Sequence, residues 1–214
     1  MSENRRPIKS RSNRFIVAIS GMLARSAVTP NQISSASVIF AALGAIALLR
    51  IDSPWAMIVA IAGIQLRLLC NVIDGLVAVE GGKKSVVGAL YNEFPDRLAD
   101  SLLLAAAGYA SGVPSLGWAS ALLAALTAYV RVFGGAVGLE QRFIGPMAKQ
   151  HRMALLTLAC VATAAETLLH RHHVCLLIAL SIIAAGSAVT CITRTRAIVR
   201  DLQEANTSSG ATHA

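Results

Sequence analysis

The residues best suited to chemistry lie in one stretch of the chain, which runs from Asn71 to Asp100. Five of the protein's eleven acidic residues fall inside it, and an apolar run flanks it on each side. Asn71 and Asp74 are three positions apart, whereas Asn92, Asp96 and Asp100 follow at intervals of four, and both spacings place side chains on one face of a helix. Because carboxylate and amide oxygens suit hard divalent cations, the stretch predicts a metal or phosphate site.

Small residues and lysines in the same stretch suit a phosphate ligand. Gly75, Ala78 and Gly88 leave room for a phosphate to approach the backbone. Lys83 and Lys84 add positive charge beside them. The two lysines do not belong to a P-loop, because the Gly-x4-Gly-Lys-[Ser/Thr] pattern is not met and no strand is expected before them.

A structural alternative is a solvated loop between two helices, in which the acidic residues only balance the lysines. This alternative accounts for Glu80 and can account for Glu93. It accounts poorly for Asp74, which directly follows an apolar run. Acidic residues at membrane depth are candidates for function, so the functional interpretation is favoured for Asp74.

The composition places these residues in a membrane protein. The 214 residues are 55% hydrophobic and only 14% charged, whereas a soluble domain carries about 25% charged residues. The net charge of +8 would indicate nucleic-acid binding only on a basic face of a soluble fold. Here Lys and Arg lie between apolar runs, so we expect a bilayer and no nucleic acid as partner. The four cysteines lie in apolar runs without a Cys-x-x-Cys pair, which argues against disulfides or a zinc ribbon.

Six apolar segments must position the site. Each is near the ~20 residues that a spanning helix needs, and their Ala, Gly and Ser content permits close helix packing in lipid. The expected fold is an all-α integral membrane protein, a bundle of six transmembrane helices with an N-terminal amphipathic interfacial helix. The segments are approximately Ile33–Leu49, Trp55–Ile73, Ala89–Ala110, Leu116–Ala136, Met153–Leu169 and Val174–Thr193.

The chain is expected to have three parts. Residues 1–28 form a cytoplasmic segment, in which Arg11 to Arg25 have the spacing of an amphipathic helix at the headgroups. A soluble helix packed on the loops is the alternative for that segment. Residues 29–198 form the six-helix membrane domain, and Thr29 can cap its first helix. Residues 199–214 form a polar cytoplasmic tail.

The distribution of Lys and Arg predicts the orientation of the bundle. Basic residues gather in the N-terminal segment, the second and fourth connections and the tail, whereas the other connections offer only Arg50 and Arg171. Both termini and the site are therefore expected on the cytoplasmic side of the cytoplasmic membrane. Trp55 and Trp118 fall at the opposite interface, where indole rings are enriched.

The charged stretch resembles the signature of the CDP-alcohol phosphatidyltransferase family, D-x2-D-G-x2-A-R-x8-G-x3-D-x3-D. The spacing matches without a gap over 26 residues, and five of the eight motif positions are identical. Thr29-Pro30-Asn31 before the first helix also looks like the family's usual sequence at that point. In motif order, the chain has Asn71, Asp74, Gly75, Ala78, Val79, Gly88, Asn92 and Asp96.

The resemblance implies a transferase of phospholipid biosynthesis. A CDP-linked lipid such as CDP-diacylglycerol would bind one or two Mg²⁺ or Mn²⁺ ions through its pyrophosphate. The acceptor alcohol would attack the lipid-side phosphorus, and CMP would leave. Asp96 matches the proposed general base and Asp74 a shared metal ligand. Gly75, Ala78, Gly88, Lys83 and Lys84 would then face the CDP-lipid. Dimers are common in the family, so a homodimer is one assembly that the resemblance allows.

Three positions depart from the signature. Asn71 and Asn92 replace aspartates, which removes two negative charges from the implied metal site, and Val79 replaces the arginine. Amide oxygens bind a cation more weakly than carboxylates, and Asp100, one turn beyond Asp96, is the best-placed additional ligand. Two alternatives therefore stay open, namely a catalytically degenerate family member and a non-enzymatic membrane scaffold or transporter.

Four basic residues outside the stretch could converge on an anionic acceptor. Arg131 interrupts an apolar run near the cytoplasmic end of a helix, and the others flank the last two helices. Family members with phosphorylated acceptors use basic residues in this region. Anchoring on the cytoplasmic side is an equal alternative for Arg194. The four are Arg131, Lys149, Arg152 and Arg194.

The histidines at positions 170, 172 and 173 could suggest a second metal site. They fall on the predicted outer side and lack the spacing of ligands on one helix face, so we expect an exposed loop there. Arg67 and Glu166 are expected to make buried polar contacts, and the sequence does not indicate with which partners.

Overall fold

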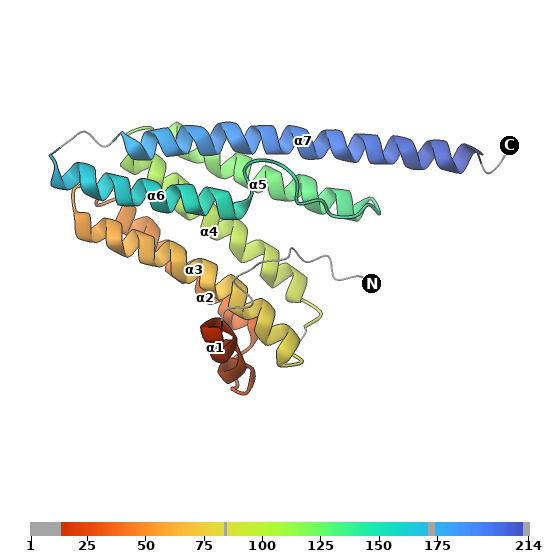
Figure 1. Ribbon diagram of the computed structural model, residues 1–214, viewed down its shortest axis with the longest axis horizontal. Coiled ribbons are helices and arrows are strands. Elements are labelled where there is room, and N and C mark those ends of the chain that lie inside the picture. The colour runs from red at the N-terminus through yellow and green to blue at the C-terminus, as the bar shows by residue number, and fades with distance from the viewer. Residues whose placement is uncertain (1–13, 84, 171–173, 212–214) are drawn as a thin grey trace.

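The structure is a computed structural model that describes residues 14–83, 85–170 and 174–211. Seven helices make up the described part of the chain (Figure 1). They are α1 (Arg14–Ala24), α2 (Pro30–Leu48), α3 (Pro54–Glu80), α4 (Gly88–Ala110), α5 (Pro114–Ala136), α6 (Lys149–Leu168) and α7 (Cys175–Ala211).

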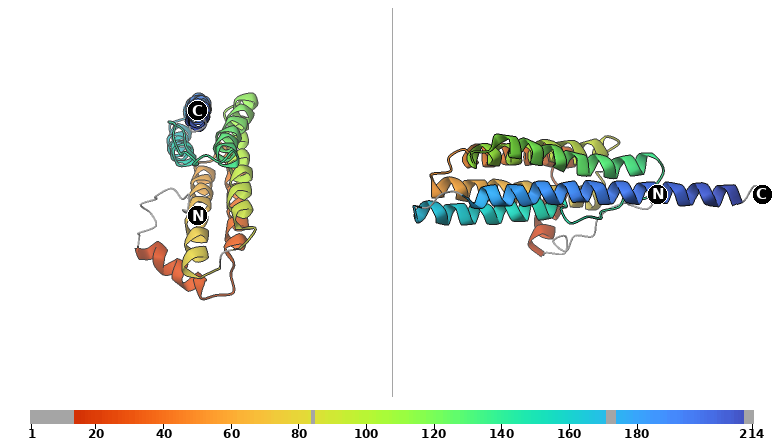
Figure 2. Two further views of the ribbon diagram at one scale, coloured as in Figure 1. Left: turned by 90° about the vertical axis from the view of Figure 1, so that its right-hand side faces the viewer. Right: turned by 90° about the horizontal axis from the view of Figure 1, so that it is seen from above.

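The six long helices, α2 to α7, lie alongside one another, and α1 lies against one end of the bundle (Figures 1 and 2). α2 packs on α3 and α4, α5 on α4 and α7, and α6 on α3 and α7. α7 extends well beyond the other helices (Figure 1). Each of the six predicted apolar segments overlaps one of these helices, although α3 and α7 continue past the predicted ends at Ile73 and Thr193.

Four helices are long and apolar enough to cross a membrane, namely α2, α3, α5 and residues 175–206 of α7. α4 and α6 have the required length, but they carry the charged residues that form the site described below. Large apolar side chains are exposed along the bundle, as lipid contact requires. The protein is therefore an all-α membrane protein.

The capping role predicted for Thr29 is confirmed. Thr29 accepts a hydrogen bond from the Gln32 backbone N–H, and the Gln32 side chain accepts one from the Thr29 backbone, which is a capping box. Ser53 caps α3 in a similar way through Ala56. Pro30 and Pro54 occupy first-turn positions, where their missing N–H groups cost nothing.

Pro95 lies inside a helix, although a proline commonly ends or kinks the helix that contains it. α4 begins at Gly88, before the proline, and continues through it to Ala110. Pro95 is buried, and packing against the neighbouring helices offsets the loss of one backbone hydrogen bond. Asn92 and Asp96 therefore lie one turn apart on a single helix.

Pairs of glycines allow the closest helix contacts, as the small-residue content predicted. At the α2–α3 crossing, a Cβ on Gly63 would lie 2.7 Å from the Phe40 carbonyl oxygen and 2.8 Å from the Gly44 Cα. At the α4–α5 crossing, a Cβ on Gly108 would lie 2.5 Å from the Gly117 Cα. Both crossings therefore require glycine.

Gly63→Ala is expected to destabilise the bundle by about 1–3 kcal/mol, because the added methyl group meets backbone atoms that cannot move aside. The matched control is Gly21→Ala, since a Cβ on Gly21 in α1 has no neighbour within 4 Å. Thermal unfolding in detergent micelles measures both variants. Equal midpoints for the two variants would contradict the close packing of α2 on α3.

The apolar side of α1 packs on the protein. Ile16, Ile19 and Leu23 contact a buried cluster that contains Ile73 and Val77 of α3. This packing resembles the alternative considered for the N-terminal segment, a soluble helix packed on the rest of the protein. Met22 on the same helix is nevertheless 74% exposed.

The loop after α3 holds the C-terminal end of α1. Lys83 Nζ donates hydrogen bonds to the carbonyl oxygens of Leu23, Ser26 and Val28, at 3.5, 2.5 and 3.0 Å. A cation at a helix C-terminus is favourable because the last carbonyl groups have no partners within the helix.

Candidate active site

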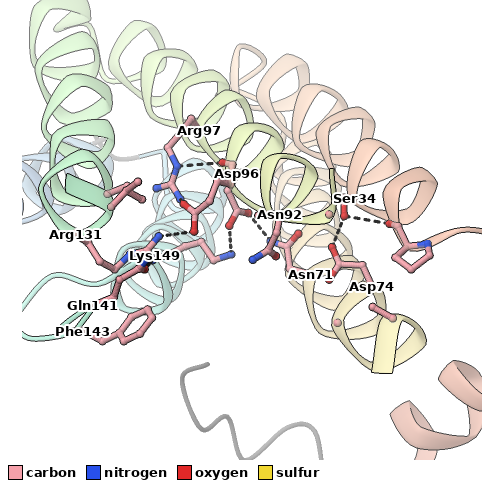
Figure 3. Close-up of a pocket in the computed structure, with 18 of the residues that line it drawn as sticks. Ser34, Asn71, Asp74, Asn92, Asp96, Arg97, Arg131, Gln141, Phe143 and Lys149 are labelled. Carbon is pink, nitrogen blue, oxygen red and sulfur yellow. Dashed lines mark hydrogen bonds and ion pairs between the residues drawn. The ribbon is translucent and has the colours of Figure 1, made fainter. Parts of the chain in front are cut away.

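A cavity of about 740 Å³ opens at the end of the bundle where α3 ends and α4 begins (Figure 3). A cavity of this size suits a small organic ligand. Twelve of the fourteen predicted site residues line it, although they come from five helices and the loop after α3. They are Asn71, Asp74, Gly75, Ala78, Lys83, Gly88, Asn92, Asp96, Arg131, Lys149, Arg152 and Arg194.

The two remaining residues differ from the others. Lys84 lies outside the described residues. Asp100, predicted as a metal ligand, does not line the cavity and is only 2% exposed. It lies one turn deeper in α4 than Asp96, so its carboxylate reaches buried partners instead of the cavity.

Asp96 is the most heavily bonded carboxylate of the cavity (Figure 3). Asn71 Nδ2 donates to its Oδ1 at 2.7 Å, and Arg67 Nη2 lies 3.3 Å from the same atom. Lys149 Nζ lies 2.5 Å from its Oδ2. These donors come from α3 and α6, so Asp96 joins three helices at the cavity.

A buried charge network lies directly beneath the cavity. Asp100 Oδ1 is 2.7 Å from Arg67 Nη2, and Asp100 Oδ2 is 2.8 Å from Arg152 Nη2. Arg67 and Arg152 are 0% and 1% exposed, and Arg152 also donates to the Met147 carbonyl oxygen at 3.0 Å. The carboxylates of Asp96 and Asp100 thus neutralise guanidinium groups that could not otherwise be buried.

Asp74 lies on the opposite side of the cavity from Arg131 (Figure 3). Ser34 Oγ donates to Asp74 Oδ2 at 2.5 Å and so fixes the carboxylate from α2. The sequence interpretation had not singled out Ser34, whose place in an apolar run gave no signal of a role. The buried polar contacts expected for Arg67 are confirmed, and the structure identifies their partners as Asp96 and Asp100.

Arg131 lies at the other side of the cavity in a polar cluster. Its Nη2 is 2.5 Å from Glu93 Oε1, and its Nη1 donates to Gln141 Oε1. Its guanidinium carbon lies 5.1 Å from the centre of the Phe143 ring, which is a cation–π contact. Arg97 Nη2 donates to the second Glu93 oxygen at 2.8 Å.

Arg194 reaches the cavity from α7. Its Nε donates to the Ile144 carbonyl oxygen at 2.9 Å and its Nη1 to the Thr127 carbonyl oxygen at 2.5 Å. The four basic residues predicted for an anionic acceptor therefore line one cavity, as expected. Lys83 lines the cavity too, but its ammonium group is directed to the carbonyl groups of α1.

Within the described residues, no group of three His, Cys, Asp or Glu side chains could hold a metal ion. Asn71 and Asn92 line the cavity at two positions where the family signature has aspartates, so the cavity keeps oxygen ligands but has two carboxylates fewer than the signature implies. The three histidines at positions 170, 172 and 173 are only partly described; His170 is exposed just after α6, and positions 172 and 173 lie outside the described residues. Glu166 caps α7, since its Oε1 accepts from the backbone N–H groups of Val174 and Cys175.

The fold and the cavity define an all-α membrane protein with a site for a charged ligand at one end of the bundle. No family model matches the chain. The archaetidylinositol phosphate synthase of Aeropyrum pernix is 34% identical over 151 residues, which are 70% of this chain and 75% of that protein. The chain belongs to the CDP-alcohol phosphatidyltransferase family.

Solved structures share the fold. The phosphatidylinositol phosphate synthase of Mycobacterium tuberculosis with CDP-DAG bound superposes with a TM-score of 0.73 at 17% identity, over 86% of this chain and 94% of that one. The same enzyme in complex with manganese and citrate gives a TM-score of 0.71 at 17% identity, over 86% and 88% of the two chains.

Proposed function

We propose that the protein transfers a substituted phosphate group from a CDP-linked lipid to a phosphorylated alcohol and releases CMP. One observation carries this proposal. The cavity brings the aligned motif residues together with Arg131, Lys149, Arg152 and Arg194. A lipid pyrophosphate and an acceptor phosphate both need positively charged partners, and a cavity lined by these four basic residues can bind both groups. The relative in Aeropyrum pernix, an archaetidylinositol phosphate synthase, favours an inositol phosphate as acceptor.

We propose that all six helices from α2 to α7 span the membrane. The cavity lies at the end of the bundle that carries the N-terminal segment, the α3–α4 and α5–α6 connections and the C-terminus. Lys and Arg are concentrated in these segments, which supports a cytoplasmic location. Trp55 and Trp118 are exposed near the starts of α3 and α5, at the other end of the bundle.

α1 would lie at the cytoplasmic headgroups, with Met22 directed to lipid. The three parts of the chain would end at residues 28, 198 and 214. A homodimer is the assembly that we propose from the family.

A divalent cation, Mg²⁺ or Mn²⁺, fits the donor set. Asp74 and Asp96 provide carboxylate oxygens, Asn71 and Asn92 provide amide oxygens, and all four side chains line one cavity. Such oxygen ligands match hard cations that also bind substrate phosphates. When bound, the cation stabilises the charge that develops on the leaving CMP.

The chain's own residues position the acceptor and take its proton. Arg131, Lys149 and Arg194 attract the acceptor phosphate, so that its hydroxyl group reaches Asp96. Asp96 accepts the hydroxyl proton while the oxygen bonds to the lipid-side phosphorus, and the bond from this phosphorus to the CMP oxygen breaks. Arg67 and Asn71 hold Asp96 Oδ1 in place during this step.

The purified protein tests the proposal with CDP-diacylglycerol, Mg²⁺ or Mn²⁺ and a panel of alcohols that includes inositol and inositol phosphate. We expect metal-dependent CMP release with a phosphorylated acceptor and none after chelation. If no acceptor yields CMP, and Asp96→Asn behaves like the parent, the degenerate or non-enzymatic alternatives are correct.

Asn92→Asp is expected to tighten Mn²⁺ binding by about tenfold, because a carboxylate replaces a neutral amide among the ligands. Titration of Mn²⁺ followed by electron paramagnetic resonance measures the affinity without turnover. Asn31→Asp is the control, since it adds the same charge at the rim of the same cavity. Unchanged or weaker Mn²⁺ affinity of Asn92→Asp would count against the gap-free alignment of the motif.

A further inference from the structure

Glu93 is an unexpected carboxylate in the part of the cavity that attracts anions. It follows Asn92 directly and does not occupy any conserved position of the family motif. Its side chain lines the cavity and remains 33% exposed. An acidic side chain beside the basic residues of an anion site competes with the anion for these residues, so its presence there calls for an explanation.

The contacts of Glu93 are those that a bound anion would make. Its Oε1 lies 2.5 Å from Arg131 Nη2, and its Oε2 accepts from Arg97 Nη2 at 2.8 Å. Two guanidinium groups therefore hold one carboxylate through separate oxygens. Arginine binds carboxylate and phosphate oxygens with the same planar donor geometry, so a phosphate can take the same place.

Arg131 is preorganised for this place independently of Glu93. Its Nη1 donates to Gln141 Oε1 from the α5–α6 connection, and its face lies 5.1 Å above the Phe143 ring. Its side chain is only 10% exposed. These contacts fix the guanidinium, and its Nη2 is left to face an anion in the cavity.

Glu93 itself is not fixed in the same way. Within the described residues, the ion-pair partners of its carboxylate are the two arginines, and a third of the side chain reaches solvent. Partly exposed ion pairs contribute little to stability, so rotation of the carboxylate into water costs little. A phosphate, with a larger charge and three oxygens, would then compete successfully for both arginines.

We propose that Glu93 is a specificity-determining residue, an internal anion that occupies the phosphate site formed by Arg97 and Arg131 until the acceptor displaces it. Glu93 thereby lowers the affinity for weakly charged anions and keeps the two arginines paired when no acceptor is bound. The substrate class is a phosphorylated alcohol, so this inference rests on the proposed function.

Inorganic phosphate is the probe for the first test, because its binding does not require turnover. We expect Glu93→Gln to tighten phosphate binding by about tenfold in a calorimetric or ³¹P NMR titration, since one competing charge is removed. The matched control is Glu80→Gln, which removes the same charge at an exposed position outside the cavity lining. In the double variant Glu93→Gln/Arg131→Gln, the gain should disappear.

Each other result overturns the inference. An equal gain in Glu80→Gln would indicate a long-range effect of net charge. Unchanged or weaker phosphate binding in a Glu93→Gln protein with the parent's thermal midpoint would show that Glu93 does not compete with anions.

Turnover provides the second test. In Glu93→Gln, the ratio of kcat/KM for inositol phosphate to that for inositol should rise at least about tenfold, mainly through KM. An equal loss with both acceptors would assign Glu93 to hydroxyl binding instead, and the inference would be wrong. If no variant releases CMP but the phosphate titrations behave as expected, the proposed function fails and the anion site stands.

Discussion

Replacement of Asp96 by asparagine is expected to lower kcat by a factor of about 10²–10⁴ with little change in thermal stability. General-base catalysis by a positioned carboxylate contributes a factor of this size. Asparagine keeps the shape of the side chain but cannot accept the hydroxyl proton. Arg67 still has Asp100 as a partner at 2.7 Å, so the buried network survives. CMP release at saturating acceptor measures the effect.

The control for this variant is Asp201→Asn. Asp201 is also paired with an arginine, since its Oδ2 lies 3.0 Å from Arg142 Nη2, but it does not line the cavity. Its replacement should leave kcat within about twofold of the parent. A decrease of less than tenfold in kcat for Asp96→Asn, at an unchanged thermal midpoint, would remove Asp96 from the role of base.

Replacement of Asp100 by alanine is expected to destabilise the protein by about 3–5 kcal/mol, the cost of removing one partner from a buried ion pair. Asp100 is 2% exposed, and the two arginines that it joins are buried as well. Without it, Arg152 loses its only carboxylate partner within the described residues. Unfolding of the reconstituted protein by a denaturing detergent measures the loss of stability.

Asp201→Ala is the matched control for stability, because it breaks an ion pair that is less buried than that of Asp100, with side chains 44% exposed for Arg142 and 13% exposed for Asp201. The loss of this pair should therefore cost no more than about 1 kcal/mol. Similar losses of unfolding free energy for the two variants would show that the buried Asp100 network contributes no more to stability than the Asp201 ion pair. Arg67→Met tests the same network from α3 and should also be strongly destabilising.

The helices were predictable because each consists of an apolar run that ends at clear signals. Thr29 and Pro30 mark the start of α2 by local chemistry alone. Pro95 is a position where such local signals do not decide the structure. Local rules place a proline at a helix end, but the buried environment of Pro95 stabilises a continuous α4.

The candidate site was predictable where its residues follow one another along two helices. The spacing from Asn71 to Asp96 identified the motif, and the convergence of Arg131 with Lys149 followed from their places near the same helix ends. The pairings were not predictable. Lys149 meets Asp96 across 53 residues, and Arg67 meets Asp100 only because α2 packs on both α3 and α4 and so brings these two helices within reach of each other's long side chains. Lys83 was assigned to the lipid donor, yet its contact with α1 depends on how that helix packs on α3.

The buried network also constrains the order in which the protein can be assembled during synthesis. α4 carries Asp96 and Asp100 and is not apolar enough to count among the spans that composition alone identifies. α3 leaves the ribosome first and already contains Arg67, so α4 emerges with one counter-ion available beside it. Lys149 and Arg152 follow only with α6. The unit that can insert early is therefore the group of α2, α3 and α4, in which α2 packs on both other helices. The site is completed when the later helices arrive.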